Sequence, residues 1–141
     1  MTIYLGFDPG RDKCGVAVMD DATNLFYHEV ILADAVLETV ESLRKTYDFS
    51  LLIMGNQTTA QQWQQRLQTE ISPPLAIALV NERNSTLEAR ERYWEMFPPS
   101  FRQKLLPKGM RLPPRPIDDI VAILLIERYL ESLQSPNITK L

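Results

Sequence analysis

The N-terminal part of the chain alternates between short apolar runs and polar turns. Apolar residues dominate positions 3–7, 16–19 and 25–32, and the turn residues Asp8-Pro9-Gly10 and Asn24 separate these runs. Short apolar runs bounded by Pro, Gly and Asn are typical of strands joined by tight turns. The pattern therefore predicts a meander of three strands before the first helix.

The rest of the chain alternates helix patterns with strand patterns. Two continuous apolar runs, 51–55 and 75–80, are typical of strands buried on both faces. Apolar spacing, cap residues or acidic first turns predict four helices, at 33–47, 58–69, 85–96 and 117–133. We therefore expect an α/β domain over residues 1–134, with a mixed five-stranded sheet whose last two strands are parallel and helices on both faces. We expect a frayed tail at 135–141.

Composition and length favour an ordinary globular domain. The chain has 141 residues, of which 45% are hydrophobic and 23% charged. No apolar stretch approaches the roughly 20 residues of a membrane helix, so we expect a cytoplasmic protein. One cysteine, Cys14, and one histidine, His28, exclude an internal disulfide and a Cys-based zinc site and give no basis for a His–Asp–Ser triad. Any catalysis would have to come from carboxylates.

Positive charge is concentrated in one proline-rich segment. The formal net charge is −3, yet residues 96–117 contain no acid and hold six of the ten prolines. Removing the five cations of this segment would leave −8 for the remainder. Its composition predicts a mobile or extended basic loop over residues 98–116, acting either as a solvated linker or as a nucleic-acid contact. The five cations are Arg102, Lys104, Lys108, Arg111 and Arg115.

Four acids lie where an α/β sheet binds its ligands. Asp8 ends the first strand, Glu82 follows the fifth, and Asp118 and Asp119 start the last helix. Strand ends of this kind border the ligand crevice of an open sheet. Side chains of adjacent helical residues project roughly 100° apart, so only one of the two aspartates faces a given site. We expect Asp118 to do so, because the small Ala122 lies one turn later and allows close packing, and we expect Asp119 to be an outer carboxylate.

Two of these acids also have a simpler interpretation. Asp8 could cap its turn, and Glu82 could be a capping residue paired with Arg83 or Arg11. Taken together, acids without His or Cys suit Mg²⁺ or Mn²⁺ better than zinc. Two such ions about 3.5–4 Å apart would activate a water and stabilise the leaving oxygen of a phosphodiester.

Three motifs occur in the order found in a known nuclease family. They are Gly6-Phe7-Asp8-Pro9-Gly10-Arg11 with Gly15-Val16-Ala17, Asn81-Glu82-Arg83-Asn84-Ser85-Thr86, and Ile117-Asp118-Asp119-Ile120-Val121-Ala122 with Tyr129-Leu130. Over nearly its whole length the chain resembles the YqgF branch of the RuvC-like, RNase H-fold nucleases. This group is described as Holliday-junction resolvases and is associated with maturation of the ribosomal RNA precursor.

The resemblance implies an RNase H-like fold, a nucleic-acid substrate and roles for particular residues. Asp8, Glu82 and Asp118 would be the metal-binding acids, and Gly10, Arg11 and Arg83 would lie near the scissile phosphate. The chain departs from the family in three places. Asn81 stands where Asp is usual, and the basic loop is longer and richer in proline. Residues 54–59, where the family has a Gly-x-Pro segment followed by a glycine-rich turn, are shorter and lack that proline.

Three functions are compatible with these motifs, and the length of the chain excludes one of them. The first is a metal-dependent endonuclease acting on branched or structured nucleic acid, for junction resolution or rRNA-precursor processing. The second is a catalytically inactive RNase H-like module that binds nucleic acid or a protein. The third, an ATP-binding protein of the actin and sugar-kinase type, fails because such proteins close two domains on the nucleotide and this chain has room for one. Whether the substrate is DNA or RNA, and whether the protein forms a homodimer, remain open.

Overall fold

A five-stranded mixed sheet forms the centre of the protein. The computed structural model describes residues 1–57 and 59–134. The strands are β1 (Ile3–Asp8), β2 (Lys13–Asp20), β3 (Leu25–Leu32), β4 (Leu51–Gly55) and β5 (Ile77–Val80). Their order is β3-β2-β1-β4-β5; β1, β2 and β3 form an antiparallel meander, and β4 runs parallel to both β1 and β5. The predicted α/β architecture is therefore confirmed.

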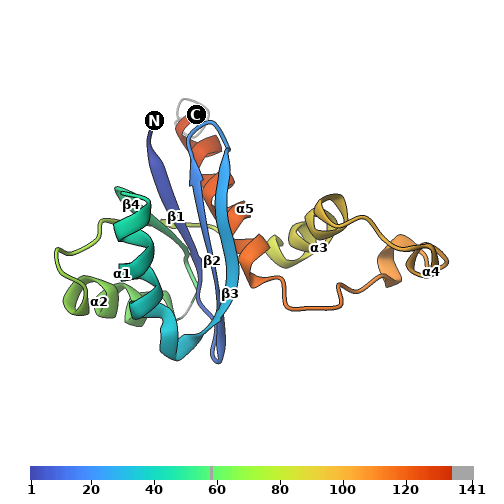
Figure 1. The fold of residues 1–141 in the computed structure, drawn as a ribbon, viewed down its shortest axis with the longest axis horizontal. Helices are drawn as coiled ribbons and strands as arrows, with labels where there is room; N and C mark the ends of the chain where they lie inside the picture. The colour runs from blue at the N-terminus through green and yellow to red at the C-terminus, as the bar shows by residue number, and fades with distance from the viewer. Residues whose placement is uncertain (58, 135–141) are drawn as a thin grey trace.

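Helices cover both faces of this sheet (Figure 1). On one side lie α1 (Val36–Thr46), preceded by the 3₁₀ turn η1 (Ala33–Ala35), and α2 (Ala60–Glu70); on the other lies α5 (Asp118–Gln134). Alternate residues of β1 face opposite sides, as in any strand, so Phe7 packs with α1 and α2 while Tyr4 packs with α5. A further helix, α3 (Ser85–Met96), packs against α5 through Ala89 and Tyr93.

Two glycines let α5 lie directly on the sheet. A Cβ at Gly6 in β1 would be 2.3 Å from the Ala122 carbonyl oxygen, and a Cβ at Gly15 in β2 would be 1.8 Å from the Asp118 carbonyl oxygen. Gly15 is also the cross-strand partner of Asp8. The start of α5 is therefore held against the carboxyl end of β1.

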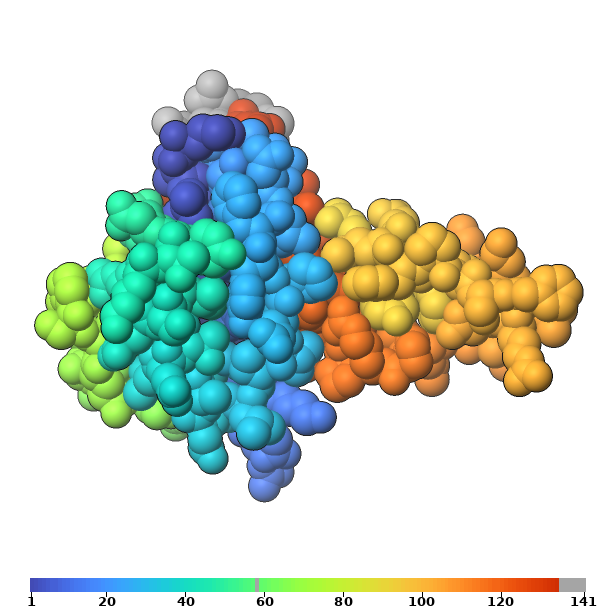
Figure 2. Space-filling view, viewed as in Figure 1, coloured from blue at the N-terminus to red at the C-terminus, as the bar shows by residue number. Residues whose placement is uncertain are grey.

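The basic loop is more structured than its composition predicts. It contains the short helix α4 (Phe101–Lys104) and the 3₁₀ turn η2 (Lys108–Met110), so the chain is not extended at these residues. A capping box explains α4, because Ser100 and Gln103 satisfy each other's backbone N–H groups. Together with α3, this segment projects from the body of the protein (Figures 1 and 2).

The remaining differences concern element boundaries. The fifth strand is shorter than expected, and the first helix begins with a 3₁₀ turn. In the described part of the chain, no helix combines the length and apolar character needed to span a bilayer. The frayed tail expected at 135–141 lies outside the described residues.

Candidate active site

Three of the expected acids meet at one edge of the sheet. β1, β4 and β5 are parallel, so their carboxyl ends share that edge. Asp8 is the last residue of β1, Glu82 follows β5 by two residues, and Asp118 is the first residue of α5. We call the group Asp8, Glu82 and Asp118 the acidic edge.

Asp8 is the most perturbed residue of the acidic edge. Its side chain lies inside the protein, and the residue is only 7% exposed. Burial, followed by the negative charges of Asp118 and Glu82, raises the pKa of Asp8 to about 8. Burial also raises the pKa of Asp118, and a hydrogen bond from the protonated Asp8 carboxyl partly offsets this increase. The two carboxyl groups therefore lie close together.

The Glu82 carboxylate is buried without a partner. Neither of its oxygens is exposed to solvent, and neither accepts a hydrogen bond from any described residue, Arg83 and Arg11 included. Burial raises the pKa of Glu82, while the positive charge of Arg128 opposes the increase. The space for the carboxylate exists because residue 55 is glycine: a Cβ at Gly55 would be 2.0 Å from Glu82 Oε2. A buried, unpaired carboxylate is costly, so this group calls for a partner that is not a protein side chain.

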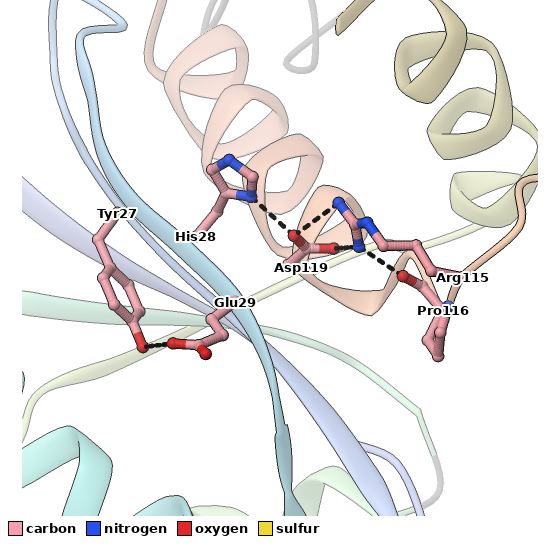
Figure 3. Close-up of polar contacts among 6 residues, drawn as sticks. All are labelled: Tyr27, His28, Glu29, Arg115, Pro116 and Asp119. Carbon is pink, nitrogen blue, oxygen red and sulfur yellow. Dashed lines mark hydrogen bonds and ion pairs between the residues drawn. The ribbon is translucent and has the colours of Figure 1, made fainter. Parts of the chain in front are cut away.

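Asp119, the adjacent residue on α5, has a complete set of partners (Figure 3). His28 Nδ1 lies 2.7 Å from one carboxylate oxygen, and the guanidinium of Arg115 donates to both oxygens at 3.0 and 3.3 Å. Burial alone would raise the pKa of Asp119, but the hydrogen bonds from Arg115 and His28 lower it below its usual range. We call these three residues the Asp119 cluster. No local sequence pattern links His28 to Asp119, because 91 positions separate them.

The expected nucleic-acid-binding residues fall into two groups. Gly10 and Arg11 lie in the β1–β2 turn, and Arg83 is exposed beside Glu82. Arg102, Lys104 and Lys108 of the basic loop are exposed, whereas Arg111 and Arg115 are half-buried.

Those two arginines make internal contacts. Arg111 donates to the carbonyl oxygens of Leu106 and Lys104 at 2.9 and 3.2 Å. Arg115 binds Asp119 and lies over the rings of Tyr93 and Phe97, with its guanidinium carbon 5.4 and 5.5 Å from the ring centroids. Charge exposed for a ligand therefore comes mainly from the first part of the basic loop.

The acidic edge matches a hard cation in the type of its donors. It offers only carboxylate oxygens, which Mg²⁺ and Mn²⁺ prefer, and the orphaned oxygens of Glu82 provide unused acceptor capacity. Over residues 1–57 and 59–134, no group of three or more acidic, His or Cys side chains is already arranged as a metal site. Ligation would therefore require side-chain rotation at this edge.

Comparisons with known proteins agree with the sequence resemblance. No family model matches the chain. A Coxiella burnetii (strain CbuK_Q154) protein named "Putative pre-16S rRNA nuclease" is 30% identical, with 92% of each chain covered. A protein of the same name from strain Dugway 5J108-111 is 28% identical with the same coverage.

Solved structures show the same fold. Thermus thermophilus RuvC matches with a TM-score of 0.58 and 11% identity, covering 94% of this chain and 96% of the other. T. thermophilus RuvC in complex with a Holliday junction substrate matches with a TM-score of 0.56 and 13% identity, covering 96% and 97%. The fold of the chain is thus the RNase H-like fold of RuvC.

Proposed function

The chain belongs to the YqgF-like family of pre-16S rRNA nucleases, and from this premise we propose that it is a divalent-metal-dependent endonuclease acting on branched or structured nucleic acid. The observation that carries the metal dependence is the buried, unpartnered carboxylate of Glu82 beside Asp8 and Asp118. Anionic groups confined in this way are stabilised by a cation, and hydrolysis of phosphodiesters is chemistry that such cations support.

In this proposal Asp8, Glu82 and Asp118 hold one or two Mg²⁺ or Mn²⁺ ions. Bound ions would supply an activated water and stabilise the leaving oxygen. Asp8 supplies a carboxylate from a rigid strand and gives up its proton when a cation binds. Asp119 is a positioning residue: its bonds to Arg115 and His28 fix the first turn of α5, so that Asp118 stays beside Asp8.

Positive groups flank the acidic edge and extend along the basic loop. Arg11 and Arg83 would contact phosphates near the cleaved bond. Arg102, Lys104 and Lys108 would contact the substrate farther away, where Phe101, which is 81% exposed, offers a face for base stacking. Exposed cations beside an exposed aromatic ring favour nucleic acid over a linker role.

A panel of substrates tests the activity. Labelled four-way DNA junction, DNA duplex, single-stranded DNA and structured RNA are incubated with the protein in Mn²⁺ or in chelator, with Asp8→Asn purified identically as control. We expect cleavage in Mn²⁺ that chelator abolishes and that Asp8→Asn lowers by roughly 10³-fold or more. The preferred substrate decides between DNA and RNA. If the wild type cleaves nothing and Asp8→Asn binds every substrate as the wild type does, the protein is instead an inactive RNase H-like binding module.

Salt dependence tests the basic loop. Each phosphate contact contributes about 0.7–0.9 to the slope of log K against log salt, so replacing Arg102, Lys104 and Lys108 by Ala should flatten the slope by about 2–3. Lys45→Ala, which removes one exposed charge from α1, is the control and should leave the slope unchanged. An unchanged slope in the triple variant would make the basic loop a linker.

We also propose the cytoplasm as the location and a homodimer as the form acting on junctions, because two acidic edges could then meet two strands. Light scattering of the protein bound to a four-way junction measures the number of chains per junction. One chain per junction would contradict the dimer.

A further inference from the structure

A second surface feature lies at the same end of the sheet as the acidic edge, on the side covered by α1 and α2. It is a pocket of about 510 Å³ between the β1–β2 turn, η1 and the N-terminal half of α2. The residues that matter for its chemistry are Arg11, Asp34, Gln57, Gln62, Trp63 and Arg66. None of them belongs to the acidic edge.

The wall formed by α2 places an arginine guanidinium over an aromatic ring. The Arg66 guanidinium lies 4.7 Å from the centroid of the Trp63 ring, and Trp63 in turn packs edge-on against Phe7 at 5.2 Å. Glu70 holds Arg66 from the side through a hydrogen bond of 3.0 Å. Because one side of the guanidinium covers Trp63, its opposite side is the one left for a ligand. Nucleic-acid bases stack on arginine planes held in this way.

The other groups of the pocket suit the rest of a nucleotide. The side-chain amides of Gln57 and Gln62 each donate and accept, and the carboxylate of Asp34 accepts, which matches the mixed edge of a base. Arg11 is exposed and positive, as a phosphate contact requires. A base within a duplex has both faces covered by its neighbours, so only an unpaired base could use this wall.

We propose that this pocket binds one unpaired nucleotide of the substrate strand, with its base against Arg66, its edge toward Gln57, Gln62 and Asp34, and its phosphate at Arg11. This inference rests on the proposed function, since it assumes a nucleic-acid substrate. Gly10, which also lines the pocket, follows Asp8 by two residues, so their Cα atoms are at most about 7.6 Å apart. Phe7 faces α1 and α2, so the Asp8 side chain faces the α5 side, and the bound nucleotide lies across the end of β1 from the acidic edge. The enzyme therefore prefers cleavage sites that have an unpaired nucleotide a short distance away to sites within continuous duplex.

The position of the pocket also gives a role to a segment that departs from the family pattern. Gln57 and Thr59, two residues of the segment 54–59 that lacks the proline usual in the family, line the pocket.

Equilibrium binding in chelator tests the pocket without cleavage. The probes are end-labelled single-stranded RNA, a duplex with a single-stranded tail, and a blunt duplex. Arg66→Lys keeps the charge and removes the planar group, and it should weaken binding of the first two probes on the order of tenfold while leaving the blunt duplex unchanged. Gln62→Ala should weaken the same two probes. The control is Gln65→Ala, an exposed glutamine of the same helix outside the lining, which should bind like the wild type.

Abasic probes identify the stacked base. A single abasic position should weaken the wild type by about the same factor as Arg66→Lys does, and should weaken Arg66→Lys no further. If the two losses multiply, or if Arg66→Lys binds all probes like the wild type, the pocket is not a nucleotide site. That outcome leaves the nuclease intact if the wild type still cleaves in Mn²⁺. If the abasic position and Arg66→Lys are coupled but the wild type cleaves nothing, the nucleotide-binding pocket is supported and the nuclease proposal is rejected.

Discussion

The acidic edge and the Asp119 cluster lie side by side, and their carboxylates have opposite surroundings. At the acidic edge, burial and mutual repulsion raise the pKa of Asp8 to about 8, and Glu82 has no hydrogen-bond partner among the described residues. One residue along α5, Asp119 is bound by a histidine and an arginine, and its pKa is lowered. The Asp119 carboxylate is thus paired with protein side chains, whereas we propose that a cation pairs with the acidic edge.

The two aspartates have different partners because their side chains point in different directions around the axis of α5. Asp118 faces the end of β1, where Asp8 lies beside it, and the positive charge of Lys13 only partly offsets the rise in its pKa. Asp119 faces β3 and the end of the basic loop, which supply His28 and Arg115. A structural ion pair is complete within the protein, whereas a group of like charges is retained in spite of its cost to stability.

The largest expected effect separates the two aspartates by activity. Asp118→Asn keeps the shape of the side chain and removes a charge from the acidic edge, so cleavage in Mn²⁺ should fall by roughly 10³-fold or more. Asp119→Asn makes the same chemical change one residue away and should keep cleavage within about tenfold. Single-turnover cleavage rates measure both variants. Equal losses would mean that both aspartates act directly on the substrate or the metal.

Two glycine variants test whether the space beside Gly55 is needed to place the Glu82 carboxylate. Gly55→Ala would place a methyl group 2.0 Å from Glu82 Oε2 and must displace the carboxylate, so cleavage should fall by roughly 10- to 100-fold. Gly109→Ala is the matched control, because a Cβ there has no atom within 4 Å among the described residues. Full activity of Gly55→Ala would show that the placement of Glu82 is unimportant for cleavage.

For the free energy of unfolding, unlike for cleavage, Asp119→Asn should have a larger effect than Asp118→Asn. Asp119→Asn weakens charge-assisted hydrogen bonds to His28 and Arg115, and the free energy of unfolding should fall by about 1–3 kcal/mol. Asp118→Asn relieves repulsion and should leave the metal-free protein as stable as the wild type or more so. Urea unfolding in chelator makes the measurement. A destabilised Asp118→Asn would mean that the acidic edge also supports the fold.

The smallest expected effect is a difference in pH dependence. The pKa of Asp8 is higher in the folded than in the unfolded protein, so its contribution is fully present below pH about 4 and is lost as the pH rises to about 8. The lowered pKa of Asp119 acts in the other direction, and its contribution is lost only as the pH falls below about 4. In chelator, the loss of stability from pH 5 to 8.5 should be smaller in Asp8→Asn than in the wild type. Parallel pH profiles of the two proteins would contradict the raised pKa.

Much of this arrangement follows from local sequence. Strand alternation and helical spacing predict the order of the elements, and the strand ends predict that Asp8 and Glu82 lie at one edge. The partners of Asp119 could not be predicted in this way. His28 lies beside Asp119 because β3 pairs with β2 and α5 packs on β2. These are long-range contacts, which the local periodicity of the sequence does not predict.

Two further features could not be predicted from the sequence because they depend on how distant parts of the chain pack together. Glycine at position 55 ends a strand in the sequence, but only the folded protein shows that its missing side chain makes room for Glu82. The five cations of the basic loop look equivalent in the sequence, whereas Arg111 and Arg115 are occupied by internal hydrogen bonds and ion pairs. The roles of Asp8, Glu82 and Asp118 in metal binding remain predictions.

Proton release on Mn²⁺ binding tests the central claim most directly. At pH 7 the Asp8 carboxyl is mostly protonated, because its pKa is about 8, and a cation that binds it must displace the proton. Calorimetric titration in two buffers of different ionisation enthalpy should show close to one proton released per wild-type chain, and weak binding without release in Asp8→Asn. Absence of Mn²⁺ binding, or binding of equal strength in Asp8→Asn, would contradict a metal site at the acidic edge.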